Sequence, residues 1–156
     1  MQPQGSSKLK MTTDIHGWVE VRKFKDQDGQ GEFYSAIKID HFVEKNYKVF
    51  AYLFGIRNNF YFKPKFGQRG LPHYEQFQIH SKCHNEKSET LQDLQNWGVD
   101  AHDATYVTYK ELKEILPRLV SDKVVTQGWL ALFAMMYDLN AIYNDEDIRL
   151  VVWFDN

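Results

Sequence analysis

The chain has 156 residues, of which 43% are hydrophobic and 15% aromatic, so it is long enough to bury one hydrophobic core. Its 19 basic and 21 acidic residues give a formal net charge of −2, which excludes a protein whose overall charge drives general binding to nucleic acid or to anionic membranes. The single cysteine, Cys83, cannot form an internal disulfide and favours a reducing compartment, which we expect to be the cytoplasm.

The start of the chain is polar and lacks the apolar segment of a secretory signal. We therefore predict a flexible tail at residues 1–12, followed by one domain at residues 13–156. The longest apolar run, at residues 129–137, is about half as long as the roughly 20 residues that a membrane-spanning helix needs. A soluble protein without a membrane partner is expected.

The first predicted elements form a β-hairpin. Residues 15–24 alternate between apolar and polar side chains, which is typical of a strand with one buried face. The Asp- and Gly-rich segment 26–31 has the composition of a turn, and residues 33–39 are rich enough in β-branched and aromatic residues to form the returning strand.

The next part of the chain is predicted to contain two helices separated by a loop. Apolar residues spaced at i, i+3, i+4 and i+7 within residues 47–54 predict a short helix that ends near Gly55. Residues 57–80 contain Pro and Gly among aromatic side chains, which predicts an ordered loop. A second helix is expected at residues 88–97, with Gly98 as its C-terminal stop.

Two further helices are predicted in the last third of the chain. Thr108 and Glu111 have the spacing of a capping box, so a helix begins there and continues until Pro117 kinks or ends it. Another helix is expected at residues 126–143. Its predicted inward-facing residues are Leu130, Phe133, Ala134 and Tyr137.

The last predicted element is a strand at residues 148–154, which are nearly all apolar and therefore indicate a central strand covered on both faces. Together these elements predict an α+β domain. Its small mixed or antiparallel sheet combines the N-terminal hairpin with the C-terminal strand and packs against about four helices.

The first candidate site combines a strand and a loop. Asp14 and His16 lie on one face of the opening strand, about 7 Å apart by the rise of a strand, so both can reach one ion. His102 follows in a predicted loop, next to Asp103. If this loop covers the strand, Asp14, His16 and His102 form a nitrogen and oxygen set suited to zinc, manganese or iron. A hydrogen-bonded histidine at a polar strand end is the simpler explanation of the first pair.

Two other acidic or histidine-containing segments do not match metal sites. The cluster His73, His80, Cys83 and His84 lacks the paired-ligand spacing of a structural zinc site. The turn at Asp26 resembles the start of a calcium loop, but Ile37 stands where the bidentate Glu is required, so calcium binding is excluded.

A basic candidate site follows the first helix. Arg57 and Asn58, together with Arg69 in the following loop, lie among aromatic residues. Guanidinium groups beside aromatic rings suit phosphates and stacked bases, which favours a nucleotide ligand. The same aromatics are equally suited to anchoring a long loop in the core, and both alternatives remain open at this stage.

Five short motifs follow one another in a recognisable order: D-I-H at residues 14–16, an aromatic helix ending at Arg57, R-G-L-P at residues 69–72, D-A-H at residues 100–102 and W-F-D-N at residues 153–156. In this order the chain resembles a family of small uncharacterised bacteriophage and prophage proteins. Ala101, Asp103 and Ala104 stand where that family usually has Gly, Ser and a second His.

The resemblance implies a bacterial host cytoplasm but no established activity. It also implies that the polar residues of the five motifs form one site. These residues are Asp14, His16, Arg57, Arg69, His102 and Asp155.

Two functions follow as expectations. The first is a phage-encoded accessory protein that acts by binding, countering host defence by blocking a host protein or by sequestering a small nucleotide signal. Its ligand-binding residues would be Arg57, Asn58, Arg69 and Asp155. The alternative is a metal-dependent hydrolase or phosphoesterase in which Asp14, His16 and His102 hold a divalent metal ion. Sequence leaves open whether the protein is an enzyme, and its oligomeric state.

Overall fold

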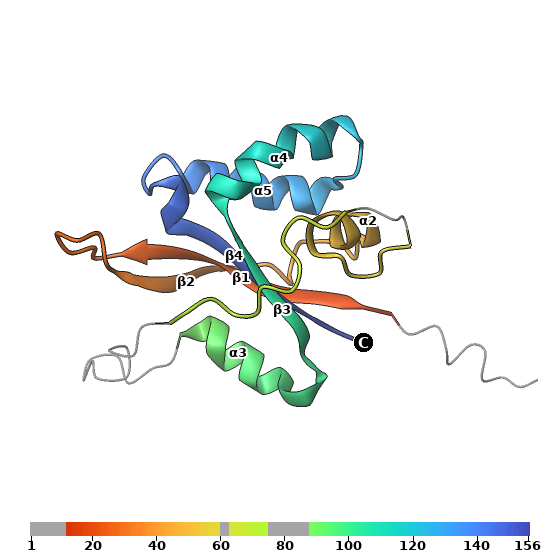
Figure 1. The fold of residues 1–156 in the computed structure, drawn as a ribbon, viewed down its shortest axis with the longest axis horizontal. Helices are drawn as coiled ribbons and strands as arrows, with labels where there is room; N and C mark the ends of the chain where they lie inside the picture. Colours follow the sequence, from red (N-terminus) through yellow and green to blue (C-terminus); the bar gives the residue numbers. More distant parts are fainter. Residues whose placement is uncertain (1–11, 60–62, 75–87) are drawn as a thin grey trace, which may run out of the picture.

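The computed structural model describes residues 12–59, 63–74 and 88–156. Within these residues, four strands form one antiparallel sheet in the order β2-β1-β4-β3, with helices on both faces (Figure 1). The strands are β1 (Asp14–Lys23), β2 (Glu32–Lys38), β3 (His102–Thr108) and β4 (Ile148–Asp155). The helices are α2 (Tyr47–Val49), continuing into the π-helical η1 (Phe50–Phe54), α3 (Glu89–Trp97), α4 (Tyr109–Ser121) and α5 (Gln127–Leu139), with short 3₁₀ turns η3 (Gly98–Asp100) and η4 (Asp145–Asp147). The predicted α+β fold is confirmed.

The two central strands of the sheet are β1 and β4. They pair in one continuous register, from Asp14 opposite Asp155 to Val21 opposite Ile148. β4 is buried along its length apart from its last residue, because strands cover both of its edges and helices cover both of its faces. The predicted central position of this apolar strand is therefore confirmed.

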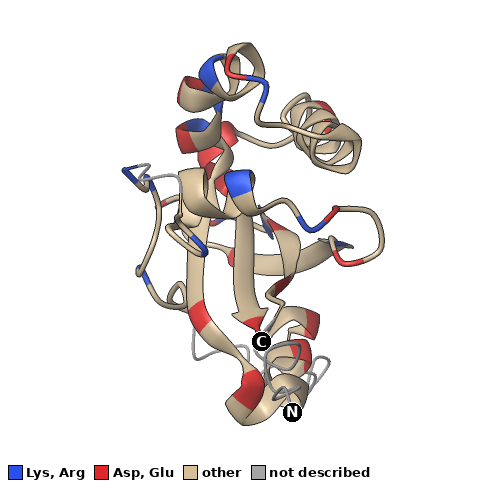
Figure 2. Ribbon diagram, turned by 90° about the vertical axis from the view of Figure 1, so that its right-hand side faces the viewer, with Lys and Arg blue, Asp and Glu red and all other residues tan. Residues whose placement is uncertain are grey.

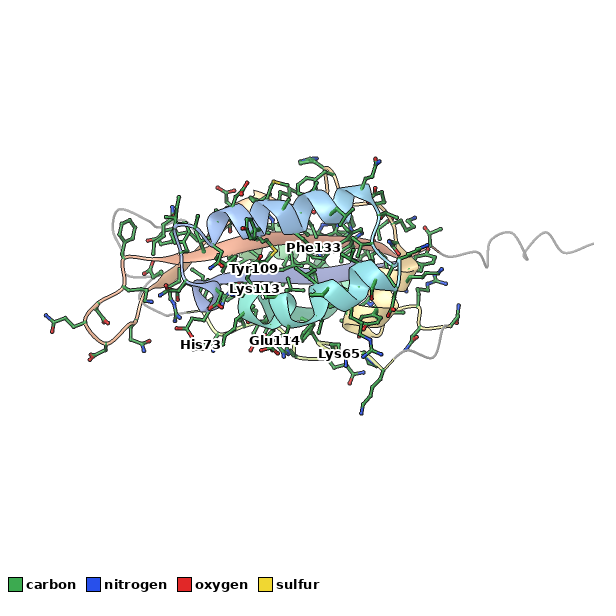
Figure 3. The ribbon with its side chains drawn as sticks, turned by 90° about the horizontal axis from the view of Figure 1, so that it is seen from above. Lys65, His73, Tyr109, Lys113, Glu114 and Phe133 are labelled. Atoms are coloured by element: carbon green, nitrogen blue, oxygen red, sulfur yellow. The ribbon has the colours of Figure 1, made fainter. Side chains whose placement is uncertain are left out.

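One face of the sheet packs against α4 and α5, which lie side by side over it (Figure 3). Leu112 and Leu119 of α4 are fully buried there. The buried residues of α5 are Trp129, Leu132, Phe133 and Met136, which follow the i, i+3, i+4, i+7 spacing of a helix face. Burying each of these side chains contributes roughly 1.5–3 kcal/mol, so this face supplies a large part of the core. No helix in the described part of the chain is both long and apolar enough to cross a membrane.

The opposite face of the sheet is covered by α3 and carries a buried ion pair. The Nε of Arg149 donates a hydrogen bond to Oε1 of Glu20 at 2.7 Å, and the hydroxyl of Tyr74 donates to the other carboxylate oxygen at 3.0 Å. The guanidinium of Arg149 also lies 3.6 Å from the ring centroid of Phe33. Because Glu20 and Arg149 are paired residues of β1 and β4, a one-residue change of register would move one of them to the other face and break this contact.

The helix predicted at residues 47–54 is present and ends at Gly55, which has a φ of 76°. Its N-cap is Asn46, whose side chain accepts a hydrogen bond from the amide of Val49. Every residue from Val49 to Phe54 is buried, so the helix is apolar on all sides and not only on the predicted stripe.

Two details of the sequence prediction were wrong, and a third was narrowed. Residues 102–108 form the edge strand β3, whereas a loop was predicted at its start. Of the two outcomes predicted at Pro117, a kink or an end of the helix, the end is excluded because α4 continues to Ser121. In α5, Leu130 and Tyr137 are 45% and 70% exposed, since the buried face is rotated relative to the predicted one.

Candidate functional site

The polar motifs of the sequence gather at one end of the sheet. Antiparallel pairing places the start of β1 beside the end of β4, with Asp14 opposite Asp155. The start of β3 lies at the same end, because His102 is opposite Phe154. Figure 2 shows acidic residues close to the end of β4. We call the region formed by residues 13–16, 102–103 and 154–156 the polar end of the sheet.

On the α3 face of the polar end, His16 lies between two carboxylates. Its Nδ1 is 2.6 Å from Oδ2 of Asp40, and its Nε2 is 3.1 Å from Oδ1 of Asp155. The imidazole stacks on Trp97 with 3.9 Å between ring centroids, and His16 is only 8% exposed. A ring with a carboxylate at each nitrogen is best satisfied as an imidazolium that donates two hydrogen bonds.

The protonation of this cluster follows from its contacts. Burial opposes the charged form of His16, but the hydrogen bonds and charges of Asp40 and Asp155 together raise its pKa above 6.5. Burial likewise works against the charged form of Asp40, yet the hydrogen bonds from His16 and from the amide of Gly17 lower its pKa. The cluster is a closed ion-pair network in which neither ring nitrogen is left for a metal or a substrate.

The predicted metal set of Asp14, His16 and His102 is not assembled. Neighbouring residues on a strand point to opposite faces, and Ile15 and His102 both stand opposite Phe154, so His16 and His102 lie on opposite faces of the sheet. Asp14 forms an ion pair with Lys45 at 2.9 Å. In residues 12–59, 63–74 and 88–156, no group of three or more His, Cys, Asp or Glu side chains could hold a metal ion.

The structure describes only part of the second histidine-containing cluster. His80, Cys83 and His84 fall outside the described residues, and His73 is exposed. In the hairpin turn, Oδ1 of Asp26 accepts hydrogen bonds from the amides of Asp28 and Gln30.

On the face opposite α3, His102 forms a pair with its neighbour. Its Nδ1 is 2.6 Å from Oδ2 of Asp103, which orients the ring. Its Nε2 is buried and has no hydrogen-bond partner among the described residues. Asp103 adopts a left-handed conformation with a φ of 54°, at the bulge where the pairing of β3 with β4 shifts.

A pocket of about 390 Å³ opens beside Asp103. It lies between the end of η1, the loop at residues 63–70 and the start of β3, and its volume is within the usual range of small-molecule sites. The wall residues are Phe54, Gly55, Ile56, Pro64, Lys65, Gly67, Gln68 and Asp103. Figure 3 shows Lys65 at the side of the molecule, where its ammonium group is exposed.

The backbone around this pocket is strained. Non-glycine residues rarely adopt a positive φ, yet Arg57, Gln68 and Asp103 do so, at 54°, 62° and 54°. Gln68 and Asp103 line the pocket, and Arg57 directly follows the wall residue Ile56. Strained residues persist only where the surrounding structure holds them, and they cluster at ligand sites.

The 63–70 loop is held from both sides. The amide of Phe66 donates to the carbonyl of Leu53 at 2.7 Å, and the hydroxyl of Thr105 donates to the carbonyl of Phe66. At Gly67 a Cβ atom would come within 2.5 Å of the carbonyl oxygen of Phe54, so only glycine fits this close approach. The pocket wall is therefore fixed to η1 and to β3.

Arg69 fixes the same loop to α4. Its guanidinium donates to both carboxylate oxygens of Glu111, at 2.8 and 2.5 Å, and to the carbonyl of Tyr106 at 3.2 Å. The hydrogen bonds from Arg69 lower the pKa of Glu111 to about 2. The guanidinium also lies over the ring of Phe66.

Arg57 connects the loop after η1 to Thr13, which precedes β1, and through it to the C-terminal residue Asn156. Its Nε donates to the hydroxyl of Thr13 at 2.8 Å, and that hydroxyl donates to Oδ1 of Asn156 at 2.9 Å. Asn58, the residue next to Arg57, is half-buried. Arg57 and Arg69, predicted as ligand-binding residues, are thus engaged within the fold.

Sequence reasoning missed several residues around His16 and around the pocket beside Asp103. They are Thr13, Asp40, Lys65 and Trp97. The combination of Pro64 and Gly67 around Lys65 was the available signal for a tightly turned loop. No signal marked Asp40 or Trp97, because their contacts with His16 depend on the packing of distant segments.

Comparison of the chain with protein-family models, with curated proteins and with solved structures finds no match.

Proposed function

We propose that this chain is a binding protein that holds a small polar ligand, of mononucleotide size, in the pocket between η1, the 63–70 loop and β3. The observation that carries the proposal is a pocket of about 390 Å³ that is lined by two left-handed non-glycine residues, Gln68 and Asp103, while a third, Arg57, directly follows the wall residue Ile56. Strained non-glycine residues cluster at ligand sites, and two of them line this one pocket.

The chemistry of the pocket walls supports a nucleotide. Lys65 offers an ammonium group to a phosphate. Gln68 and Asp103 offer amide and carboxylate groups that can hydrogen-bond the edge of a base. Ile56 and Pro64 provide apolar surface for its face.

The predicted ligand-binding residues take a different part in this proposal. Arg57 and Arg69 hold the pocket walls through Thr13 and Glu111, so they position the pocket without contacting the ligand. Asp155 is bound to His16 on the other face of the sheet. Because the predicted metal ligands are separated, no observation favours the hydrolase alternative.

The biological role that we propose is that of a phage-encoded accessory protein, which sequesters a nucleotide signal in the host cytoplasm. The order of the five sequence motifs supports this role, and the pocket supports its chemistry.

The experiment is isothermal titration calorimetry of the full chain with the four 5′-mononucleotides and with 3′,5′-cyclic AMP and cyclic GMP. At least one should bind with a Kd of roughly 10 μM or tighter, which corresponds to about −7 kcal/mol. Mass spectrometry of small molecules released from the purified, heat-denatured protein would reveal a ligand that is already bound. Absence of both titration heat and a released molecule would contradict the proposal.

Two variants locate the binding. Lys65→Ala should weaken binding at least tenfold, whereas Lys123→Ala, at another exposed lysine, should leave it unchanged. Gln68→Gly relieves the left-handed backbone, so it should weaken binding without lowering the melting temperature. A parallel loss of binding and stability in Gln68→Gly would mean that Gln68 is only structural.

A further inference from the structure

A second pocket, of about 410 Å³, lies at the opposite end of the sheet from the polar end. It is an open depression between the β1–β2 hairpin and the segment that follows α5. Its walls include Arg22, Lys23, Phe24, Lys25, Ile142 and Asp147. We call it the hairpin-end pocket.

The walls of the hairpin-end pocket carry an excess of positive charge. Three basic residues face one acidic residue, Asp147, which gives a local charge of 3 − 1 = +2. Asp147 is bound by Arg22 at 2.6 Å and by Lys25 at 2.7 Å, and its side chain is only 4% exposed. The ammonium group of Lys23 lies 5.6 Å from the ring centroid of Tyr34, and no described carboxylate forms an ion pair with it.

Three neighbouring acidic residues have contacts within the fold. Glu32, which stands opposite Lys23 in the pairing of β1 with β2, accepts a hydrogen bond from the hydroxyl of Tyr34 at 3.1 Å. Asp26, in the hairpin turn, accepts the amides of Asp28 and Gln30. Asp145, in η4, forms an ion pair with Lys113 at 2.8 Å. Among the wall residues of the pocket itself, Asp147 is the one carboxylate beside three cations.

Phe24 combines two unfavourable features. Its φ is 55°, which is an outlier for a bulky residue, and it is 82% exposed although it is aromatic. Across the pocket, Ile142 is 80% exposed. The internal ring contact of Phe24 is an edge-on approach to Tyr34, with 5.8 Å between centroids. Neither the backbone conformation nor the exposure is needed to complete the core, so a contact outside the chain is the reason we assign to them.

We infer that the hairpin-end pocket docks an acidic segment of a partner protein. Carboxylates of the segment pair with Arg22, Lys23 and Lys25, and one of its apolar side chains inserts between Phe24 and Ile142. Aromatic residues and arginine are enriched at such interfaces, and complementary charge speeds and orients the encounter. An open depression suits a peptide segment better than an enclosed small molecule. The inference is independent of the nucleotide pocket, which lies at the other end of the sheet.

The test is a titration of the ¹⁵N-labelled full chain, followed by heteronuclear NMR. The probe is a 12-residue peptide in which Glu or Asp alternates with Leu, and the control peptide carries Gln or Asn in place of the acids. The acidic peptide should cause saturable shifts of the amides at residues 22–25 and 142–147, and the neutral peptide should bind at least tenfold more weakly.

Four outcomes overturn the inference. These are the absence of saturable shifts, shifts located elsewhere, equal binding of the neutral peptide, and saturable binding of inorganic pyrophosphate at this pocket without binding of the peptide. Concentration-dependent self-association that shifts the same amides would mean that the surface binds a second copy of the chain. That result would also overturn the inference of an acidic partner segment.

A variant separates binding from folding. Phe24→Gly removes the ring and relieves the backbone, so peptide affinity should fall at least tenfold while the melting temperature stays the same or rises. Lys123→Gly is the matched control, because Lys123 has a φ of 54° at an exposed position outside the pocket. It should change the melting temperature in the same direction and leave the affinity unchanged. A Phe24→Gly protein that binds as tightly as the parent, or that melts at a lower temperature, overturns the inference.

Discussion

The two ends of the sheet use charged residues in different ways. At the polar end, His16 is 8% exposed and has a carboxylate at each ring nitrogen, so both ring nitrogens are paired within the fold. At the hairpin end, the side chains of Arg22 and Lys25 are 23% and 30% exposed and share one carboxylate. The comparison teaches that removing one member should cost more at the closed polar end than at the partly exposed hairpin end.

The largest expected effect is that of His16→Ala at the polar end. It leaves Asp40 and Asp155 without their shared partner and removes the stack on Trp97. Breaking a buried pair costs about 3 kcal/mol of the free energy of unfolding. Equilibrium unfolding in urea measures it. Lys45→Ala, which breaks an exposed pair with Asp14 at the same end, should cost only about 0.5 kcal/mol. Equal losses in the two variants would remove the distinction between closed and open pairs.

A smaller loss is expected for Asp147→Asn at the hairpin end. The substitution keeps the shape of the side chain but removes the charge that binds Arg22 and Lys25. Because both cations can turn toward water, we expect a loss of about 1–2 kcal/mol in urea unfolding. A loss larger than that of His16→Ala would reverse the comparison between the two ends.

The polar end should make the stability of the protein depend on pH. The pKa of His16 is raised in the folded state, so its contribution is complete below 6.5 and is lost as pH rises through the folded pKa. The pKa of Asp40 is lowered from 3.8, so its contribution is present above that value and is lost as pH falls through the folded pKa. Urea midpoints of the parent should therefore decline above pH 6.5 relative to those of His16→Ala. Asp147→Asn should retain this decline, and a parallel pH profile for the parent and His16→Ala would contradict the assignment.

The smallest expected effect is a gain in stability. Phe24→Gly relieves a left-handed conformation that costs about 1–2 kcal/mol, and the greater freedom of glycine in the unfolded chain offsets about 0.5–1 kcal/mol of this. A net gain of about 0.5 kcal/mol follows. Gly29→Ala in the same hairpin, at a φ of 76° with open space around it, should instead destabilise the protein. Thermal unfolding of both variants measures the opposite signs.

Local patterns in the sequence were sufficient for much of the fold. The apolar run of β4, the capping box at Thr108 and the glycine stop at Gly98 each depend on neighbouring residues, and all three are present in the structure. β3 was missed because its first residues, His102 and Asp103, are polar. They belong to an edge strand whose pairing with β4 is decided by tertiary contacts.

The candidate site was predictable only in part. Antiparallel pairing brings the start of β1 to the end of β4, as the shared polar motifs suggested, and it joins His16 to Asp155. The face on which each histidine lies was not predictable, because a one-residue change of register exchanges the two faces of a strand. The pocket at Gln68 depends on left-handed backbone conformations, which sequence patterns do not predict at non-glycine residues.

The buried ion pair between Glu20 and Arg149 has a kinetic consequence. The two residues are 129 positions apart in sequence, and they lie on the strands that every other strand needs as a neighbour. Neither central strand can complete its hydrogen bonding until the chain has closed a loop of that length, and the entropy of this closure precedes most of the stabilising contacts. The pairing of β1 with β4 should therefore govern the rate of folding. The helices, whose contacts are local, can form before or after this step.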